Sequence, residues 1–203
     1  MSGVSTGSEP SKPVYAAAGT GPLLQRDYVG TLQGGACSPE SLAKLVRERF
    51  AEFGPPETAA FKSAQRPGKP LDEGDELDIW IGGFMPCKVR VVQVDDVSLT
   101  LRTLDGHPEA GRITFKAGRD DKGRLTFQIR SRARSGGILH YVGFLLLGRS
   151  MQARCWIRFI GRVAAGCGGT LVGPVRVKTA KVEQQAADCA GNDCSTFAFD
   201  SGV

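Results

Sequence analysis

The chain has 203 residues, of which 41% are hydrophobic and 23% are charged, and a formal net charge of +5. These values are typical of an ordinary soluble globular protein with one domain, an apolar core and tails. The strongest candidate for a membrane span, 136–148, is interrupted by His140 and ended by Arg149. It is well short of the roughly 20 apolar residues that a bilayer requires, which excludes a transmembrane helix.

Residues 1–20 are expected to form a disordered leader. The first thirteen are rich in Ser, Gly and Pro and lack the apolar run of a secretory signal, so we expect a cytoplasmic protein. The six cysteines contain no CxxC pair and are expected to be reduced thiols. Cys189 and Cys194 could close a small disulfide or form half of a metal site, but no matching His/Cys pair lies nearby. We predict no metal site and no other cofactor.

An amphipathic helix is predicted to follow a strand at 23–32. Ser38 suits the N-cap, Pro39 the first helical position, and Glu40 the first turn, where the helix dipole favours a negative charge. Apolar residues then recur at helical spacing until Gly54-Pro55-Pro56 ends the run. They are Leu42, Leu45, Val46, Phe50 and Phe53.

Beyond a short candidate strand at 57–64, five segments between residues 76 and 134 alternate apolar and polar side chains, as strands with one buried face do. Their short connections favour an antiparallel meander. The side chains predicted to face the core are Leu77, Ile79, Ile81, Cys87, Val89, Val91, Leu99, Leu101, Thr103, Ile113, Phe115, Ala117, Leu125, Phe127 and Ile129.

A sheet with one apolar face must be covered, and a long helix predicted over 137–165 supplies the cover. Residues 167–203 form a C-terminal extension with one possible strand at 171–177. The folded domain is therefore expected at 21–166. Its class is α+β, with a curved antiparallel sheet wrapped around the C-terminal helix.

The nonapeptide Thr103-Leu104-Asp105-Gly106-His107-Pro108-Glu109-Ala110-Gly111 joins two of these strands. Together with the Arg-rich strand after it, Met151-Gln152 in the helix and the stretch Met85-Pro86-Cys87-Lys88-Val89, it resembles the family called domain of unknown function nineteen-ninety. The resemblance covers about residues 23–165 and implies the helix-grip fold of the START and birch-pollen-allergen superfamily. One departure is that Arg112 and Ile113 stand where the family pattern has two acidic residues.

His107 and Glu109 are the candidate catalytic residues, because an imidazole titrates near neutrality and a carboxylate two residues away could orient it. The structural alternative is that His107 donates to a backbone carbonyl while Glu109 pairs with Arg102 or Arg112. No serine or cysteine nearby belongs to a recognisable nucleophile motif.

Other candidate ligand contacts would line a cavity between sheet and helix. They are His140, Tyr141 and Trp156 on the helix and Leu101, Phe115 and Phe127 on the strands. Residues 112–162 contain twelve Arg and Lys against two Asp, and Arg130, Arg132 and Arg134 fall on one side of a strand. That row is a solvated face or a site for an anionic lipid surface or a phosphate. No aromatic residues interleave with it, so no nucleic acid is expected as a partner.

The function implied by the resemblance, together with an apolar concave face, is binding, transfer or sequestration of a hydrophobic small molecule such as a lipid or polyketide-like metabolite. The alternative is an enzyme of secondary metabolism, a cyclase, dehydratase or hydrolase-like catalyst, with His107 and Glu109 or His140 as acid/base groups. A third hypothesis, based on charge alone, is a basic module that binds nucleic acid or a membrane surface. The fold by itself does not choose among them.

Overall fold

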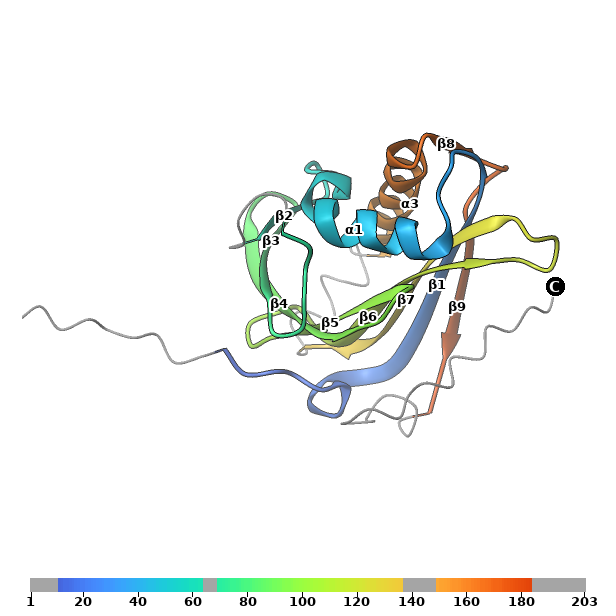
Figure 1. The fold of residues 1–203 in the computed structure, drawn as a ribbon. Coiled ribbons are helices and arrows are strands. Elements are labelled where there is room, and N and C mark those ends of the chain that lie inside the picture. The colour runs from blue at the N-terminus through green and yellow to red at the C-terminus, as the bar shows by residue number, and fades with distance from the viewer. Residues whose placement is uncertain (1–10, 64–68, 137–148, 184–203) are drawn as a thin grey trace, which may run out of the picture.

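A curved antiparallel sheet holds two helices against its concave face in the computed structural model, which describes residues 11–63, 69–136 and 149–183 (Figure 1). The elements in chain order are η1 Ala16–Ala18, β1 Thr20–Gly34, α1 Pro39–Phe53, β2 Ala59–Ser63, β3 Glu76–Ile81, β4 Met85–Val94, β5 Ser98–Thr103, β6 Glu109–Arg119, β7 Leu125–Ser135, α3 Arg149–Gly166, β8 Gly169–Leu171 and β9 Arg176–Lys181.

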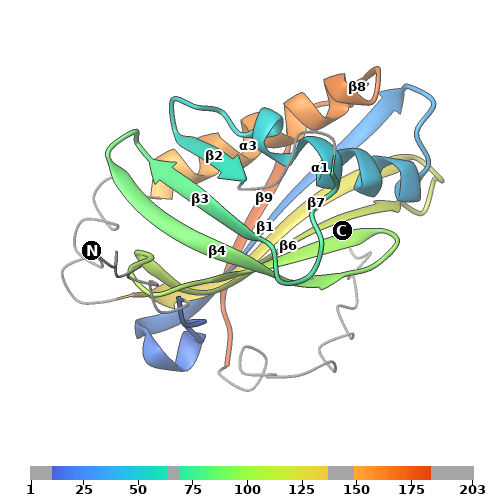
Figure 2. The ribbon, with the colours of Figure 1, turned by 60° about the vertical axis from the view of Figure 1, so that its left-hand side comes forward.

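The strand order is β2-β3-β4-β5-β6-β7-β1-β8, and β9 also pairs with β1. Every recorded pairing is antiparallel, and β2 to β7 follow one another as a meander. Figure 2 shows α3 running along the inside of the curved sheet, next to α1. The predicted α+β helix-grip architecture is therefore confirmed.

Helix α1 forms where its capping residues predict. The Ser41 amide donates to Ser38 Oγ over 3.2 Å, and the Ser38 amide donates to Ser41 Oγ over 2.7 Å. Two backbone donors at the helix start are satisfied in this way. Leu42, Val46 and Phe50 are buried on the face toward the sheet.

The alternation of the strands sets the inside of the sheet. Of the side chains expected in the core, Ile81 and Ile113 are half-buried and the rest are buried. Seven aromatic rings fill the space where α1 and α3 meet this face: Phe50, Phe53, Phe61, Phe115, Phe127, Trp156 and Phe159. Phe159 touches five of the other rings.

Gly30 allows α3 to lie directly on β1. A Cβ at this position would stand 2.5 Å from Ile160 Cγ2, far inside van der Waals contact.

The first part of the predicted long helix, with His140 and Tyr141, lies outside the described residues. Arg154, Arg158 and Arg162 of α3 are exposed, on the side that the sequence predicts.

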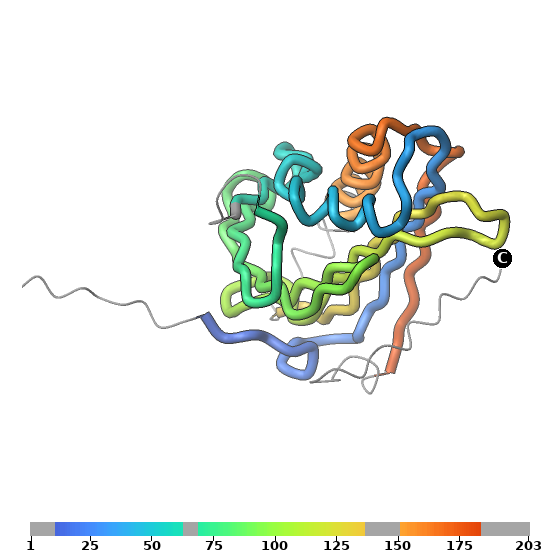
Figure 3. Tube along the Cα trace, viewed as in Figure 1, coloured from blue at the N-terminus to red at the C-terminus, as the bar shows by residue number. Residues whose placement is uncertain are grey.

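The C-terminal extension adds strands to the edge of β1. In place of the single strand expected at 171–177, β8 pairs with Leu32–Gly34 and β9 with Leu24–Val29. The break falls at 172–175, where Gly173 has a φ of +72° and is followed by Pro174. Figure 3 shows β9 running beside β1.

Residues 11–20, which the sequence places in the leader, contact the sheet. The Val14 amide donates to Thr103 O over 2.9 Å, and Tyr15 lies under the Arg102 guanidinium at 4.3 Å.

Across the described ranges, no helix has both the length and the apolarity to span a bilayer. The cytoplasmic location stays a prediction. The four described cysteines are free thiols, and Cys189 and Cys194 lie outside the described residues.

Candidate functional site

The turn between β5 and β6 is held closed by the two ends of the nonapeptide. The Gly111 amide donates to Thr103 Oγ1 over 3.0 Å, and the same hydroxyl donates to Gly111 O over 3.2 Å. Gly106 has a φ of +84°, which favours glycine. The motif therefore shapes a tight turn that presents His107 and Glu109 at the start of β6.

His107 is fastened to the backbone of Glu109. The Glu109 amide donates to His107 Nδ1 over 3.0 Å, and the same nitrogen lies 2.9 Å from Glu109 O. Burial lowers the pKa of His107, and the nearby Glu109 carboxylate opposes that effect only in part. The amide hydrogen bond suits a neutral imidazole with its proton on Nε2.

This lowered pKa predicts a loss of stability in acid. Above pH about 6.5 both states are neutral at this group, whereas below it the unfolded chain binds a proton that folded His107 resists. The free energy of unfolding should therefore fall by at most about 1.4 kcal/mol for each pH unit below that value. Urea unfolding of the wild type and of His107→Asn at neutral and mildly acidic pH measures the loss. Equal acid sensitivity of the two proteins would refute it.

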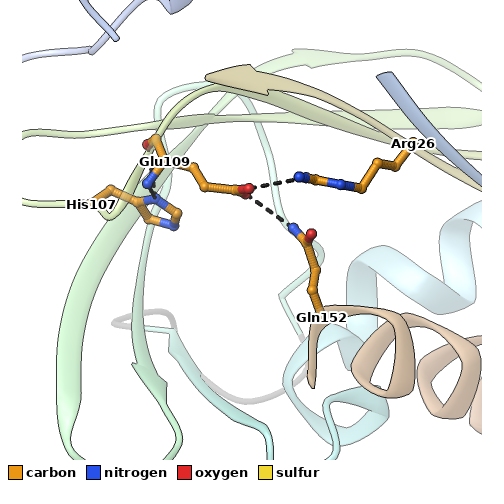
Figure 4. A network of polar contacts seen from close by, with 4 residues as sticks. All are labelled: Arg26, His107, Glu109 and Gln152. Atoms are coloured by element: carbon orange, nitrogen blue, oxygen red, sulfur yellow. Dashed lines mark hydrogen bonds and ion pairs between the residues drawn. The ribbon is translucent and has the colours of Figure 1, made fainter. Parts of the chain in front are cut away.

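The Glu109 carboxylate points away from the imidazole and toward Arg26 and Gln152 (Figure 4). Arg26 Nη1 donates to its Oε1 over 3.0 Å, and Gln152 Nε2 donates to its Oε2 over 3.0 Å. The Arg26 and Glu109 side chains are only 5% and 14% exposed. This buried ion pair and amide, from β1, β6 and α3, form the polar network of the site.

The expected pairing of Glu109 with Arg102 or Arg112 is wrong. Glu109 shares its face of β6 with Ile113 and Phe115, which pack inside, whereas Arg112 lies on the opposite face, directly across from Arg102. Arg26 was not predicted as a site residue, although it alternates with Tyr28 and Leu32 on the buried face of β1. That alternation was a signal that could have found it.

The four predicted aromatic and apolar contacts that the structure describes lie inside, whereas His140 and Tyr141 fall outside the described residues. Leu101, Phe115 and Phe127 are 2% exposed or less and Trp156 is 9% exposed. Phe115 packs edge-to-face on Trp156 at 5.6 Å between ring centroids, and Phe127 stacks on Phe159 at 6.4 Å. Their role as ligand contacts stays a prediction, as does the catalytic role of His107 and Glu109.

Among the residues that the structure describes, three further polar atoms near the network are buried without a hydrogen-bond partner: Ser131 Oγ, Gln152 Oε1 and Trp156 Nε1. Ser131 lies directly across from Arg26 in the pairing of β7 with β1. Gln152 and Trp156 are one helical turn apart on α3, on neighbouring positions of its surface. A buried polar atom without a partner costs about 1–3 kcal/mol.

The three predicted surface arginines lie together on the outer face of β7 and contact β1. Arg130 Nε donates to Asp27 Oδ1, Arg132 Nε to Gln25 Oε1 over 2.7 Å, and Arg134 Nη1 to Gly21 O over 2.8 Å. Within the described ranges, no three His, Cys, Asp or Glu side chains converge as metal ligands would.

A family model described as Domain of unknown function (DUF1990) matches residues 39–162. The chain belongs to this family. The match to DUF1990 begins at α1 and ends within α3, so that β1, β8 and β9 lie outside it. No curated protein matches the chain.

Several solved structures are similar to this DUF1990 protein. Protein CV1439 from Chromobacterium violaceum is 13% identical, over 70% of this chain and 96% of that one, with a TM-score of 0.45. Ginseng major latex-like protein 151 from Panax ginseng is 20% identical, over 65% and 98%, with a TM-score of 0.35. The di-domain ARO/CYC StfQ from the steffimycin biosynthetic pathway is 11% identical, over 72% and 51%, with a TM-score of 0.49.

Proposed function

We propose that this protein binds a hydrophobic small molecule with a polar end between its curved sheet and α3, and carries or sequesters it unchanged. The observation that carries the proposal is the Arg26–Glu109–Gln152 network on the inside of an otherwise apolar shell. Removing two charges from water costs several kcal/mol, a cost that an apolar pair of similar size would avoid. A binding site is a physical reason to keep such a pair.

The unpartnered atoms support the choice of a ligand with a neutral polar end. Gln152 Oε1 can only accept a hydrogen bond, Trp156 Nε1 can only donate one, and Ser131 Oγ can do both. A ligand hydroxyl could donate to Gln152 Oε1 and accept from Trp156 Nε1 or Ser131 Oγ, whereas a carbonyl could only accept from the latter two. Loss of the burial cost of these atoms would add to affinity. A carboxylate would lie beside Glu109 and be repelled by it.

The aromatic cluster supports an apolar body for the same ligand. Trp156 lies one helical turn from Gln152 on α3. Its ring also belongs to the aromatic cluster, where it contacts Phe115 and Phe61. A ring system or acyl chain that contacts Trp156 would gain apolar burial beside the polar anchors. The enzyme of secondary metabolism stays the alternative, with its proposed site in the same place, between the sheet and α3.

Three related probes test the proposal: naphthalene, its hydroxyl derivative naphthol, and its carboxylate naphthoate, each titrated by the fluorescence of the ring. We expect naphthol to bind about fivefold more tightly than naphthalene, the worth of one neutral hydrogen bond. Naphthoate should bind more weakly than either, because of Glu109.

Variants assign the naphthol preference to the site. Ser131→Ala should remove it while naphthalene affinity stays the same, and Thr126→Ala, on the outer face of β7, is the matched control. Trp156→Phe should reduce the preference for naphthol and also weaken naphthalene binding, because it removes apolar contact area together with the Nε1 donor. Failure of all three probes to bind would reject the proposed function. Equal binding of naphthol and naphthalene would mean that the site is apolar and that Ser131, Gln152 and Trp156 do not bind the polar end of a ligand.

A further inference from the structure

A second site lies on the opposite, outer face of the sheet. A groove of about 1120 Å³ is lined by β1, β7, β9 and the hairpin that joins β6 to β7. Eight Lys and Arg side chains line it, against three Asp side chains. It is separate from the site proposed above, because the sheet lies between them.

Strand β9 widens this basic face. Directly opposite Asp27 of β1 stand Arg130 on β7 and Lys178 on β9, and opposite Val29 stand Gln128 and Arg176. Residues directly opposite one another point to the same face of a sheet. Arg176 and Lys178, which are both exposed, therefore extend the arginine row of β7 across β1.

Two of the three carboxylates of the groove, Asp27 and Asp120, are held by their own neighbours. Asp27 accepts from Arg130, from Gln128 Nε2 over 3.0 Å and from Gln25 Nε2 over 2.7 Å. Asp120 accepts from Arg124 Nε over 2.8 Å and from two backbone amides. Among the ion pairs of the described residues, none involves Arg176 or Lys178, so the carboxylates leave those two charges unneutralised.

Further arginines lie beside Arg132 on the neighbouring strands. Arg132 lies directly across from Arg112, and Arg112 across from Arg102, so three guanidinium groups stand side by side on β7, β6 and β5. Like charges directly opposite one another are destabilising. Burial lowers the pKa of Arg132, and the neighbouring Arg130 lowers it further.

We propose that the groove binds a small soluble ligand with several phosphate groups, contacted by Arg176 and Lys178 of β9 and by Arg130 and Arg132 of β7. The planar guanidinium group matches phosphate geometry with two parallel hydrogen bonds. The hollow of the groove suits a compact ligand better than a flat membrane. None of its described lining residues is aromatic, whereas single-stranded nucleic acids are bound by stacking on such rings.

Titration calorimetry with sodium tripolyphosphate tests this site. We expect binding that weakens as salt is raised, because salt screens exposed charges. The double variant Arg176→Gln/Lys178→Gln should weaken binding at least about tenfold, since each loses a hydrogen bond to a charged group. Both side chains are exposed, so urea unfolding should show unchanged stability.

The matched control removes the same charge elsewhere. Lys44→Gln/Arg154→Gln changes exposed residues of α1 and α3 and should keep tripolyphosphate binding within about twofold of the wild type at moderate salt. Four results would overturn the proposal: no binding at low salt, an equal loss in both double variants, citrate binding as tight as tripolyphosphate, or binding only to vesicles that display phosphorylated lipids. The test does not involve the inner site, so it stands or fails independently of the proposed function.

Discussion

Replacing Glu109 by alanine is expected to lower the free energy of unfolding by about 3–5 kcal/mol, a large fraction of the stability of a typical domain. The reason is the burial of its partner, since the Arg26 side chain is 5% exposed and would lose its carboxylate. Gln152 Nε2 would lose its acceptor in the same variant. Urea unfolding, followed by circular dichroism, measures the change.

An exposed ion pair provides the control for this prediction. Glu57 pairs with Arg158, and their side chains are 52% and 55% exposed. Glu57→Ala should cost no more than about 1 kcal/mol, because water solvates the charge that remains. The double variant Arg26→Met/Glu109→Leu should recover most of the loss by removing both charges. Equal costs for Glu109→Ala and Glu57→Ala would contradict a buried, charged network.

Replacing Phe159 by alanine is expected to cost about 3–5 kcal/mol, because it leaves a cavity at the centre of the aromatic cluster. This ring is fully buried and lies 5.2 Å from Phe50, 5.4 Å from Phe115 and 5.9 Å from Trp156, measured between centroids. It therefore joins α3 to α1 and to the sheet at once. The midpoint of urea unfolding should fall, with the m-value unchanged.

Phe84 provides the matched control for Phe159, because the same substitution there removes a ring that is 77% exposed. Phe84→Ala should change the free energy of unfolding by no more than about 0.5 kcal/mol. Phe159→Leu should fall between the two, since it fills part of the cavity. Similar losses in Phe159→Ala and Phe84→Ala would mean that α3 does not depend on this cluster.

The strand faces could be predicted because they depend on a local property of the chain. Side chains of a strand alternate between its two faces, so Leu77, Val89 and Phe127 could be assigned to the core without knowledge of their neighbours. The start of α1 was equally local, since Ser38 and Ser41 satisfy each other's amides across three residues.

The partners of Glu109 could not be predicted in the same way. The nonapeptide identified the turn and its two polar residues, but the carboxylate contacts Arg26 from 83 residues away and Gln152 from 43 residues away. Those contacts depend on the register of β6 with β7, on the pairing of β7 with β1 and on the position of α3 against the sheet. An arginine closer in sequence, Arg112, points to the other face.

The meander of β3 to β7, the buried faces of these strands, the capped helix and the position of the motif turn could all be predicted, because each follows from residues within a few positions of one another. The contacts of Glu109 with Arg26 and Gln152 on the concave side of the sheet follow only from the tertiary structure. The same is true of the pairing of the C-terminal extension with β1, which widens the basic groove on the outer face. Both outcomes depend on which distant strands become neighbours, and the free energy of those pairings comes from burial and register across the whole sheet.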